Sequence, residues 1–409
     1  MIGVRRLAGR IGYLISQYPT LSHSFLFREV RGLRALGLDV RVASVIRPPA
    51  NVSGLSEEEK QEIARTYYVR AAAGTWIKAH TRVLFSRPLA YLDGLALAFA
   101  SSGWNGLRLL RHLRFFGEAI VVGAWLRKNS LAHVHTHFAS ATAWFAQRVF
   151  GLTISMTIHG SDEFIDPAGF CMSGKVAASR LVIAISRYGY SQILRFSQPD
   201  DWDRVKIVRL GINPADFEPG PAPPEDAAFQ LISVGRIVPV KAHRFLIRAC
   251  ARLLSQGRAL HLTLVGDGPE RSPLEKLVND LGISEAVTFT GAVENRAVRD
   301  LVRRSHCFVI SSFAEGIPVA MMEAMALEVA CIGTNVMGIP ELIEHGSNGL
   351  LVLPAHDESL SAAIERFIDD PQFRRSCALN GRRKILAEFD LDVNVATLSE
   401  LFVPLLAEE

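Results

Sequence analysis

Apolar, β-branched segments alternate with helical patterns along most of this chain, and no other feature of the sequence limits the fold as strongly. In the second half these segments fall at 229–234, 260–265, 286–290, 307–310 and 329–332. In the first half they fall at 11–16, 39–45, 132–136, 153–158, 181–185 and 205–208. Short apolar segments that are each followed by a helix are typical of a parallel sheet with helices on both faces. The sequence therefore predicts an α/β protein with two Rossmann-like parallel-sheet domains.

A proline-rich segment separates the two series of predicted strands. The 409 residues exceed the size at which one hydrophobic core is comfortable, so two domains are expected. Between Glu218 and Asp226 the chain has prolines at 219, 221, 223 and 224, which exclude a helix or a central strand. We interpret 218–227 as the linker between an N-terminal domain at 1–217 and a C-terminal domain at 228–388. A helical pattern closes the chain within 389–409.

The five cysteines are scattered and form no CxxC pair, which favours a reducing compartment. No apolar stretch reaches the roughly 18 uncharged residues that a membrane span needs. The N-terminus leads into the first predicted strand rather than into a signal-peptide core. We expect a cytoplasmic protein, soluble or peripheral at the inner face of the plasma membrane.

Charge is distributed unevenly. Residues 1–130 contain 19 Lys and Arg against 8 Asp and Glu, whereas the remainder contains 26 against 33. Residues 60–130 also depart from the strand–helix alternation, because they read as a mainly helical insert in which arginines accompany aromatic residues. Such an insert can face an anionic membrane, although solvated arginines on a packed helical insert would give the same pattern. Nucleic acid is a poorer partner, because no recognisable RNA- or DNA-binding motif is present.

Two carboxylates lie eight positions apart across a predicted strand-to-helix junction. Glu315 is on the loop after the strand at 307–310, Pro318 is suited to the first position of the next helix, and Glu323 lies within that helix. One ligand that spans a nucleoside and a hexose could contact both carboxylates. The segment therefore predicts a sugar-nucleotide site.

Two glycine-containing loops follow neighbouring strands of the same domain. Gly235 and Arg236 follow the strand at 229–234, and Lys241 lies at the start of the next helix. This loop therefore offers backbone N–H groups and two cations to a diphosphate. An ordinary loop with surface cations is the alternative. Gly266 and Gly268 resemble the start of a dinucleotide fingerprint, but Arg271 replaces the third glycine, so we discount NAD and interpret both glycines as a tight turn into the next helix.

Histidines mark the carboxyl end of the N-terminal sheet. His159 follows the strand at 153–158, where it could donate to a sugar hydroxyl or a phosphate, or simply be buried against the backbone. His133, His135 and His137 alternate at strand spacing, but no carboxylate or cysteine nearby in the sequence completes a metal site, so we expect none. The polar residues of 17–25 lie at the mouth of this sheet and either contact a ligand or cap the following helix.

Together these residues resemble the retaining nucleotide-sugar glycosyltransferases of family four, which have the GT-B fold. The motifs that carry the resemblance are Glu-x7-Glu at 315–323, Gly-Arg-x4-Lys at 235–241, Gly-x-Gly-Pro at 266–269, Gly-Ile-Pro-Glu-Leu-Ile at 338–343 and Gly-x-Asn-Gly-Leu-Leu-Val at 346–352. Tyr-Pro-x-x-Ser-x-Ser-Phe at 18–25 is similar to an exopolysaccharide subgroup that includes colanic-acid-type transferases. The resemblance implies two domains that face a central cleft, with the closing helix packing back on the N-terminal domain.

The resemblance also implies roles for individual residues. Arg236 and Lys241 would hold the donor diphosphate, Glu323 the ribose hydroxyls, and Glu315 and His159 would lie beside the transferred sugar. The remaining donor-binding candidates are Gly235, Gly266, Gly316, Ile317 and Pro318, and the acceptor-side candidates are Gln17, Ser22 and His23. No metal or other cofactor is required, since the two cations can neutralise the leaving group.

We therefore expect a hexose to be transferred from a nucleoside-diphosphate sugar to a lipid-linked or saccharide acceptor during synthesis of a bacterial surface polysaccharide. A sugar-nucleotide epimerase of the same fold is the first alternative. A saccharide-binding protein that retains the fold without turnover is the second.

Overall fold

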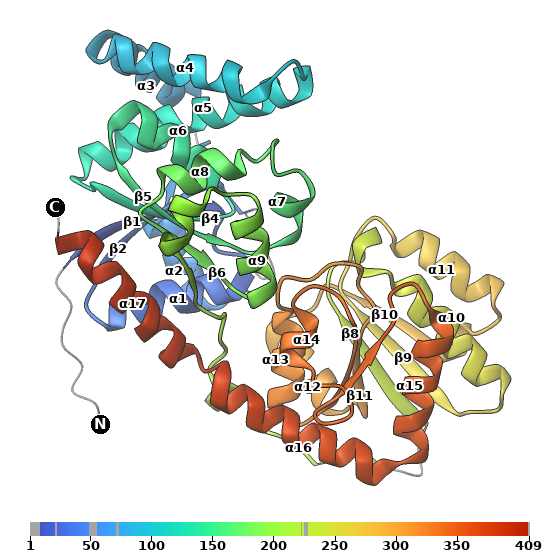
Figure 1. Ribbon diagram of the computed structural model, residues 1–409. Coiled ribbons are helices and arrows are strands. Elements are labelled where there is room, and N and C mark those ends of the chain that lie inside the picture. The colour runs from blue at the N-terminus through green and yellow to red at the C-terminus, as the bar shows by residue number, and fades with distance from the viewer. Residues whose placement is uncertain are drawn as a thin grey trace. The chain divides into compact units, whose positions relative to one another are not determined.

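The computed structural model of the chain describes residues 9–20, 23–48, 55–70, 73–221, 223–224 and 228–407. The chain forms two compact units (Figure 1). Unit 1 comprises Met1–Arg209 and Asp392–Glu409, and unit 2 comprises Leu210–Leu391. Fold and element type thus follow the sequence prediction of an α/β protein with two parallel sheets.

Unit 1 contains a seven-stranded sheet in the order β3-β2-β1-β4-β5-β6-β7, in which all pairs are parallel. The strands are β1 (Arg10–Gln17), β2 (Asp39–Ile46), β3 (Tyr67–Tyr68), β4 (His133–His137), β5 (Thr153–Ile158), β6 (Leu181–Ala184) and β7 (Val205–Ile207). The helices are α1 (Ser24–Ala35), α2 (Glu57–Arg65), α3 (Ala73–Ser86), α4 (Pro88–Ser102), α5 (Gly106–Lys128), α6 (Ser140–Phe150), α7 (Ser161–Ile165), α8 (Met172–Ala178), α9 (Arg187–Arg195) and α17 (Leu391–Ala407). A 3₁₀ helix, η2 (Pro199–Arg204), precedes β7.

The insert predicted at 60–130 consists mainly of α3, α4 and α5. These helices form a layer that stacks on α6 at one end of the unit (Figure 1). The sequence prediction missed β3, which lies inside this insert, because two residues carry no readable periodicity.

Unit 2 contains a six-stranded parallel sheet in the order β10-β9-β8-β11-β12-β13. The strands are β8 (Phe229–Val234), β9 (Leu260–Val265), β10 (Val287–Gly291), β11 (Cys307–Ile310), β12 (Ala330–Thr334) and β13 (Leu350–Val352). The helices are α10 (His243–Ser255), α11 (Arg271–Asp280), α12 (Asn295–Arg303), α13 (Val319–Ala326), α14 (Ile339–Leu342), α15 (Asp357–Asp369) and α16 (Pro371–Glu388), with 3₁₀ helices η3 (Pro214–Asp216), η4 (Pro239–Lys241) and η5 (Ser284–Ala286).

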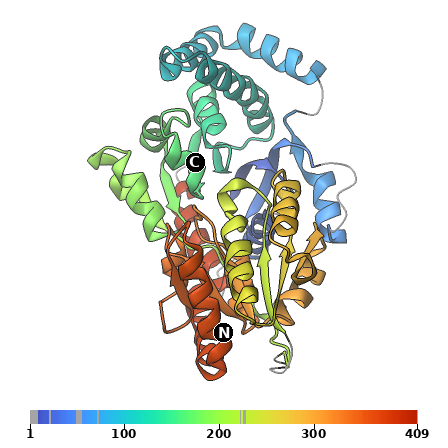
Figure 2. The same ribbon diagram turned by 90° about the vertical axis from the view of Figure 1, so that its right-hand side faces the viewer.

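Helices cover both faces of the unit 2 sheet. Figure 1 shows α12 and α13 on one face and α10, α11 and α15 on the other, and Figure 2 faces the second group. Four of the five cysteines, Cys250, Cys307, Cys331 and Cys377, are buried in this unit as free thiols, and burial raises their pKa values. Buried and unpaired, they act as small apolar side chains.

The order of the strands reverses at corresponding places in the two sheets. β1 lies between β2 and β4, and β8 lies between β9 and β11, so consecutive crossovers run to opposite sides. In open α/β sheets such a reversal opens a crevice at the carboxyl ends of the strands, and ligands bind there. The loops after β8 and β11 are therefore the first place to look for a site.

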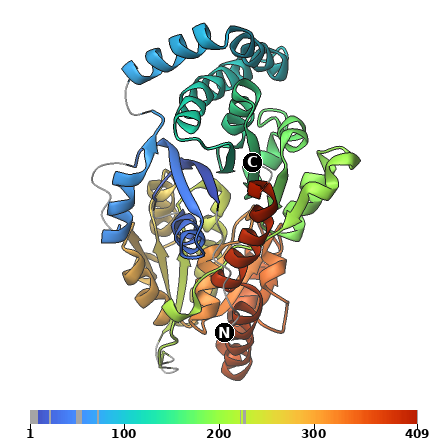
Figure 3. The same cartoon turned by 90° about the vertical axis from the view of Figure 1, so that its left-hand side faces the viewer.

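The boundary of the first unit differs from the predicted one. The structure assigns residues from Leu210 onward to unit 2, whereas the sequence placed the boundary at residue 217. The reason is backbone pairing, because the N–H of Ile212 donates to the carbonyl of Phe389 and the N–H of Leu391 to the carbonyl of Ile212, both at 3.0 Å. The last helix, α17, belongs to unit 1, where it is seen in Figure 3.

Candidate functional site

Two loops at the carboxyl edge of the unit 2 sheet bring Lys241 and Glu315 together. The Lys241 Nζ lies 2.5 Å from Glu315 Oε1, and both side chains are largely buried. The loops are joined through their backbones, since the N–H of Phe313 donates to the carbonyl of Val240 at 2.8 Å. Ser311 Oγ adds a bond to the carbonyl of Lys241 at 3.0 Å. A cation and an anion are therefore fixed at the place where the strand order reverses.

Serine hydroxyls support this pair. Ser312 Oγ donates to Glu315 Oε1 at 2.6 Å, so the carboxylate is held from two sides. The sequence prediction missed Ser311 and Ser312, although their position between a strand end and Glu315 was the signal that could have identified them. Arg236 is exposed, and in the part of the chain that the structure describes no ion pair is seen for it. Of the two predicted cations, Arg236 is thus the one without an anionic partner.

The glycines of this region allow loops to approach each other closely. A Cβ on Gly266, whose φ is +132°, would lie 2.0 Å from the carbonyl oxygen of Gly235. A Cβ on Gly268 would lie 2.3 Å from the carbonyl oxygen of Ile237. The loops after β8 and β9 therefore cross with their backbones in contact. This contact, rather than the predicted tight turn into α11, explains why glycine occupies both positions.

A third close approach places the segment before α13. Gly338 donates its N–H to the carbonyl of Glu315 at 3.1 Å, and a Cβ on Gly338 would lie 1.6 Å from the carbonyl oxygen of Gly316. Ile317 is buried. Pro318 was predicted to be the first helical residue of α13, but the structure makes it the N-cap, one position earlier. Among the described residues no side chain caps α13, so its first N–H groups are positioned to bind an anion. Glu323 lies in the second turn and is partly buried.

Histidine 159 lies in unit 1, at the carboxyl end of β5. Its Nε2 is hydrogen-bonded with His137 Nδ1 at 2.9 Å, and its buried Nδ1 has no partner among the described residues. Burial lowers the pKa of His159 well below its ordinary value, so the ring is neutral at neutral pH. Phe138, which sequence reasoning did not single out, stacks on this ring with centroids 4.2 Å apart despite a φ of +60°.

The acceptor-side candidates also belong to unit 1. Gln17 ends β1 and is partly buried. His23 is the N-cap of α1 but makes no side-chain capping bond, so the capping interpretation is wrong for this residue. Its ring instead stacks on Phe138 at 4.7 Å. Ser22 lies outside the described residues.

The alternating histidines of β4 are hydrogen-bonded with hydroxyls of β5. His133 contacts Thr153 and Ser155 at 2.7 and 2.8 Å, and His135 contacts Ser155 and Thr157 at 2.8 and 3.0 Å. The ring nitrogens of His133 and His135 are thus occupied by hydroxyl groups of the neighbouring strand.

A carboxylate approaches this ladder from α1. Glu29 Oε1 lies 3.0 Å from His137 Nε2 and accepts from the Tyr13 hydroxyl at 3.1 Å. The potential ligand atoms of Glu29, His135 and His137 lie within 4.8 Å of one another, close enough to hold a metal ion. Since both His135 nitrogens already have hydroxyl partners, we interpret the group as a hydrogen-bonded network. Sequence reasoning could not find Glu29, because only tertiary packing brings it to β4.

Acid is expected to destabilise unit 1 through His133. Burial lowers the pKa of His133 to about 4, against about 6.5 in an unfolded chain. The unfolded state therefore binds more protons between these values, and the free energy of unfolding should fall by about 2 kcal/mol on going from pH 7 to pH 5 on account of this residue. Urea unfolding at both pH values measures it. In His133→Gln the pH-dependent loss should be smaller by that amount, and an unchanged loss would contradict the assignment.

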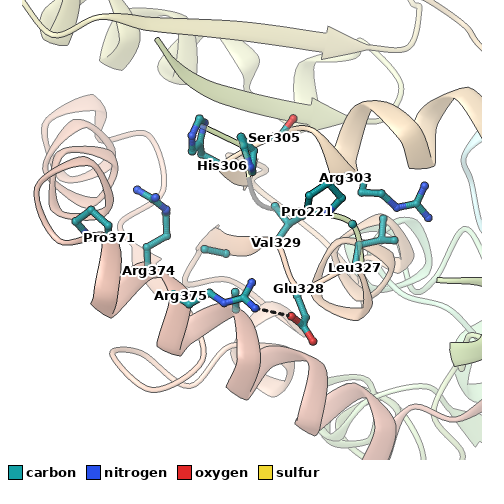
Figure 4. A pocket seen from close by; sticks show the side chains of 14 residues that line it. Pro221, Arg303, Ser305, His306, Leu327, Glu328, Val329, Pro371, Arg374 and Arg375 are labelled. Carbon is teal, nitrogen blue, oxygen red and sulfur yellow. Dashed lines mark ion pairs between the residues drawn. The ribbon is translucent and has the colours of Figure 1, made fainter. Parts of the chain in front are cut away.

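Two hollows in unit 2 lie at opposite edges of its sheet. A small one of about 60 Å³ is lined by Ser305, His306, Glu328 and Arg375, among others, next to the amino ends of β11 and β12 (Figure 4). A larger one of about 340 Å³ is lined by Pro239, His243 and Phe313, among others, beside the loop that carries Lys241. Only the second lies at the edge where open α/β sheets bind ligands.

Known proteins resemble this chain in sequence and in fold. Residues 216–384 match the family described as glycosyl transferases group 1. The amylovoran biosynthesis glycosyltransferase AmsK of Erwinia amylovora is 26% identical, over 96% of this chain and 98% of that protein. The sucrose-phosphate synthase of Thermosynechococcus elongatus superposes with a TM-score of 0.76 at 19% identity, covering 98% of this chain and 100% of that one. Anabaena Alr3699/HepE in complex with UDP-glucose superposes with a TM-score of 0.72 at 16% identity, covering 97% and 99%.

Proposed function

Residues 216–384 belong to the glycosyl transferases group 1 and the chain has the GT-B fold, and from this premise we propose that it is a retaining hexosyltransferase. The donor is a nucleoside-diphosphate sugar, and the acceptor is a lipid-linked or free saccharide. The product enters a bacterial surface polysaccharide, and the protein works on the cytoplasmic side of the membrane. The likeness to AmsK over nearly the full length of both chains supports the pathway class, and the UDP-glucose complex of HepE supports the donor class.

The observation that carries this proposal is the Lys241–Glu315 pair at the strand-order reversal, with the exposed Arg236 on the same loop as Lys241. Breaking the anomeric bond leaves negative charge on the diphosphate and positive charge on the sugar ring. Cations beside the diphosphate and a carboxylate beside the sugar ring, next to each other across the breaking bond, stabilise both charges more in the transition state than in the ground state. In this scheme Arg236 and Lys241 neutralise the leaving group, so the reaction needs no divalent ion.

The remaining roles are part of the same proposal. The start of α13 adds backbone donors for the diphosphate, and Glu323, farther along α13, accepts from the ribose hydroxyls. The family resemblance assigns His159 to a sugar hydroxyl, and its buried Nδ1, which has no partner among the described residues, is the atom that would make this contact. The acceptor hydroxyl attacks the face that the leaving group departs from, which gives retention.

Donor binding tests the proposal directly. Arg236→Ala should raise the Kd for the preferred nucleoside diphosphate by about 10- to 100-fold, since a hydrogen bond to a charged group contributes about 1.5–3 kcal/mol. Calorimetry with UDP, GDP and ADP measures it. Arg248→Ala is the matched control, because Arg248 is an exposed arginine one turn farther along α10 and does not line the 340 Å³ hollow. Equal Kd values for wild type and Arg236→Ala would refute the diphosphate assignment.

Product analysis separates the alternatives. A transferase converts donor only when an acceptor is supplied, whereas an epimerase releases an altered sugar from donor alone. A protein that binds saccharide without turnover would show neither reaction. The anomeric configuration of the product decides retention.

A further inference from the structure

The outward face of α4 is apolar. Leu89, Leu92 and Phe99 are spaced to share one side of this helix, and 83%, 54% and 52% of their surfaces are exposed. On the opposite side, Gly94 and Ala98 are buried. Surface helices of globular proteins normally have polar residues on the outward side, so α4 reverses the usual arrangement.

Neighbouring helices extend this face. We define the α3–α5 apolar surface as the exposed residues Ile77, Leu84, Phe85, Leu89, Leu92, Phe99, Trp104, Leu107 and Leu110. Phe85 is 84% exposed beside the 115° bend between α3 and α4, and Trp104 is fully exposed in the turn before α5. Figures 1 and 3 show these helices as the outermost layer of unit 1. So many large apolar side chains on one layer indicate an interaction surface.

The charges on this layer favour an anionic partner. Lys78, Arg82 and Arg87 are exposed, and among the described residues no ion pair is seen for them. Asp93, the one acidic residue in the sequence between 73 and 117, is held by Arg148 at 2.5 Å. Unpaired cations next to apolar side chains are complementary to a lipid surface with acidic headgroups.

We propose that the α3–α5 apolar surface inserts into a leaflet that contains acidic lipids, with α3 and α4 lying in the plane of the interface. Insertion is shallow, because the inner side of α4 is closely packed. A Cβ on Gly94 would lie 2.5 Å from Val149 Cγ2 and 3.0 Å from the ring of Phe116. Among the described residues no single helix is long and apolar enough to cross a membrane. The proposal deepens the proposed function by naming where a lipid-linked acceptor would be met, but its test does not depend on the reaction.

Vesicle flotation of the full chain tests the surface. The wild type should bind vesicles of phosphatidylcholine mixed with phosphatidylglycerol more tightly than vesicles of phosphatidylcholine alone. Leu89→Gln with Phe99→Gln should lower the partition coefficient at least about tenfold, since the variant loses the burial of two large apolar side chains in the membrane. Lys78→Gln, Arg82→Gln and Arg87→Gln combined should reduce binding to that of the neutral vesicles, as should high salt in the wild type.

The matched control replaces equally exposed apolar residues elsewhere. Ile165 of α7 and Leu353 after β13 are 75% and 58% exposed, and Ile165→Gln with Leu353→Gln should leave vesicle binding unchanged. Depth is measured by quenching of tryptophan fluorescence with brominated lipids, which Trp104→Phe should largely abolish. The Ile165→Gln, Leu353→Gln variant and the Trp104→Phe variant replace exposed residues, and the thermal midpoint of each variant shows whether its fold is retained.

Three results would overturn the proposal. The first is unchanged flotation of the Leu89→Gln, Phe99→Gln variant, and the second is equal binding to neutral and acidic vesicles. The third is concentration-dependent self-association that this variant abolishes, because a second copy of the chain would then cover the surface. None of these vesicle experiments uses a nucleotide sugar. A negative result would therefore not contradict the proposed sugar transfer, and loss of the proposed transfer activity would not contradict membrane binding by this surface.

Discussion

Replacing Lys241 by alanine is expected to lower the rate of sugar transfer by about 10²- to 10³-fold, the effect of removing one preorganised group that stabilises transition-state charge. The side chain lies at the carboxyl edge of the unit 2 sheet, largely buried and in contact with Glu315. In a partly desolvated site its charge is screened less than in water, which is why one cation can account for so large a factor. Steady-state kinetics with donor and acceptor varied in turn would show the loss in kcat.

Coupling between the two residues distinguishes a joint role from two separate ones. Glu315→Gln alone should also reduce kcat strongly, and the double variant should lose much less than the product of the two single effects, since each partner positions the other. Lys276→Ala, which removes a cation from a surface pair with Asp280, is the control and should leave kcat unchanged. Wild-type rates in both single variants would show that this pair is not the catalytic site.

Replacing Glu163 by alanine is expected to lower the free energy of unfolding of unit 1 by about 3–5 kcal/mol. Lys175 of α8 is wholly buried, and its Nζ contacts the Glu163 carboxylate and the Ser140 hydroxyl, the latter at 2.8 Å. Removing the carboxylate leaves an ammonium group in the interior with one neutral partner, which is costly because a lone buried charge is poorly solvated. Equilibrium unfolding in urea measures the loss.

The double variant Lys175→Met, Glu163→Gln is the control for this mechanism. It removes the charge together with its partner, so most of the lost stability should return. If the double variant were as unstable as Glu163→Ala, packing at Glu163 rather than the unpaired ammonium would explain the loss. If Glu163→Ala were as stable as the wild type, the pair would contribute nothing.

Local sequence signals were sufficient to predict the position of a strand where the strand was long or the flanking turn had few possible conformations. The segments at 153–158, 229–234, 260–265 and 307–310 were predicted with the bounds that the structure has, because their short length and the turn residues that flank them favour a buried strand over a helix. β13, with three residues, was missed as a strand even though its motif was recognised. Short edge strands depend on neighbours more than on their own residues.

The site was predictable in its loops and unpredictable in its tertiary contacts. The spacing of Lys241 and Glu315 within strand–loop–helix junctions placed each at a sheet edge, and the structure joins them. The contact of Glu29 with His137 depends instead on how α1 packs on the sheet, which no spacing reveals. Similarly, the sequence predicted a mainly helical insert at 60–130, but only the packing of α4 on α5 and α6 decides which side of α4 faces outward.

The helix α17 makes completion of unit 1 wait for the end of the chain. Phe402 of this helix is buried against the rings of Tyr13 and His135, with centroids 6.4 and 4.9 Å apart, and Val395 packs on Gly32. Unit 2, by contrast, is continuous in sequence and ends where Leu391 pairs with Ile212. Unit 1 is therefore discontinuous in sequence, and its core needs a helix that is encoded after the whole of unit 2.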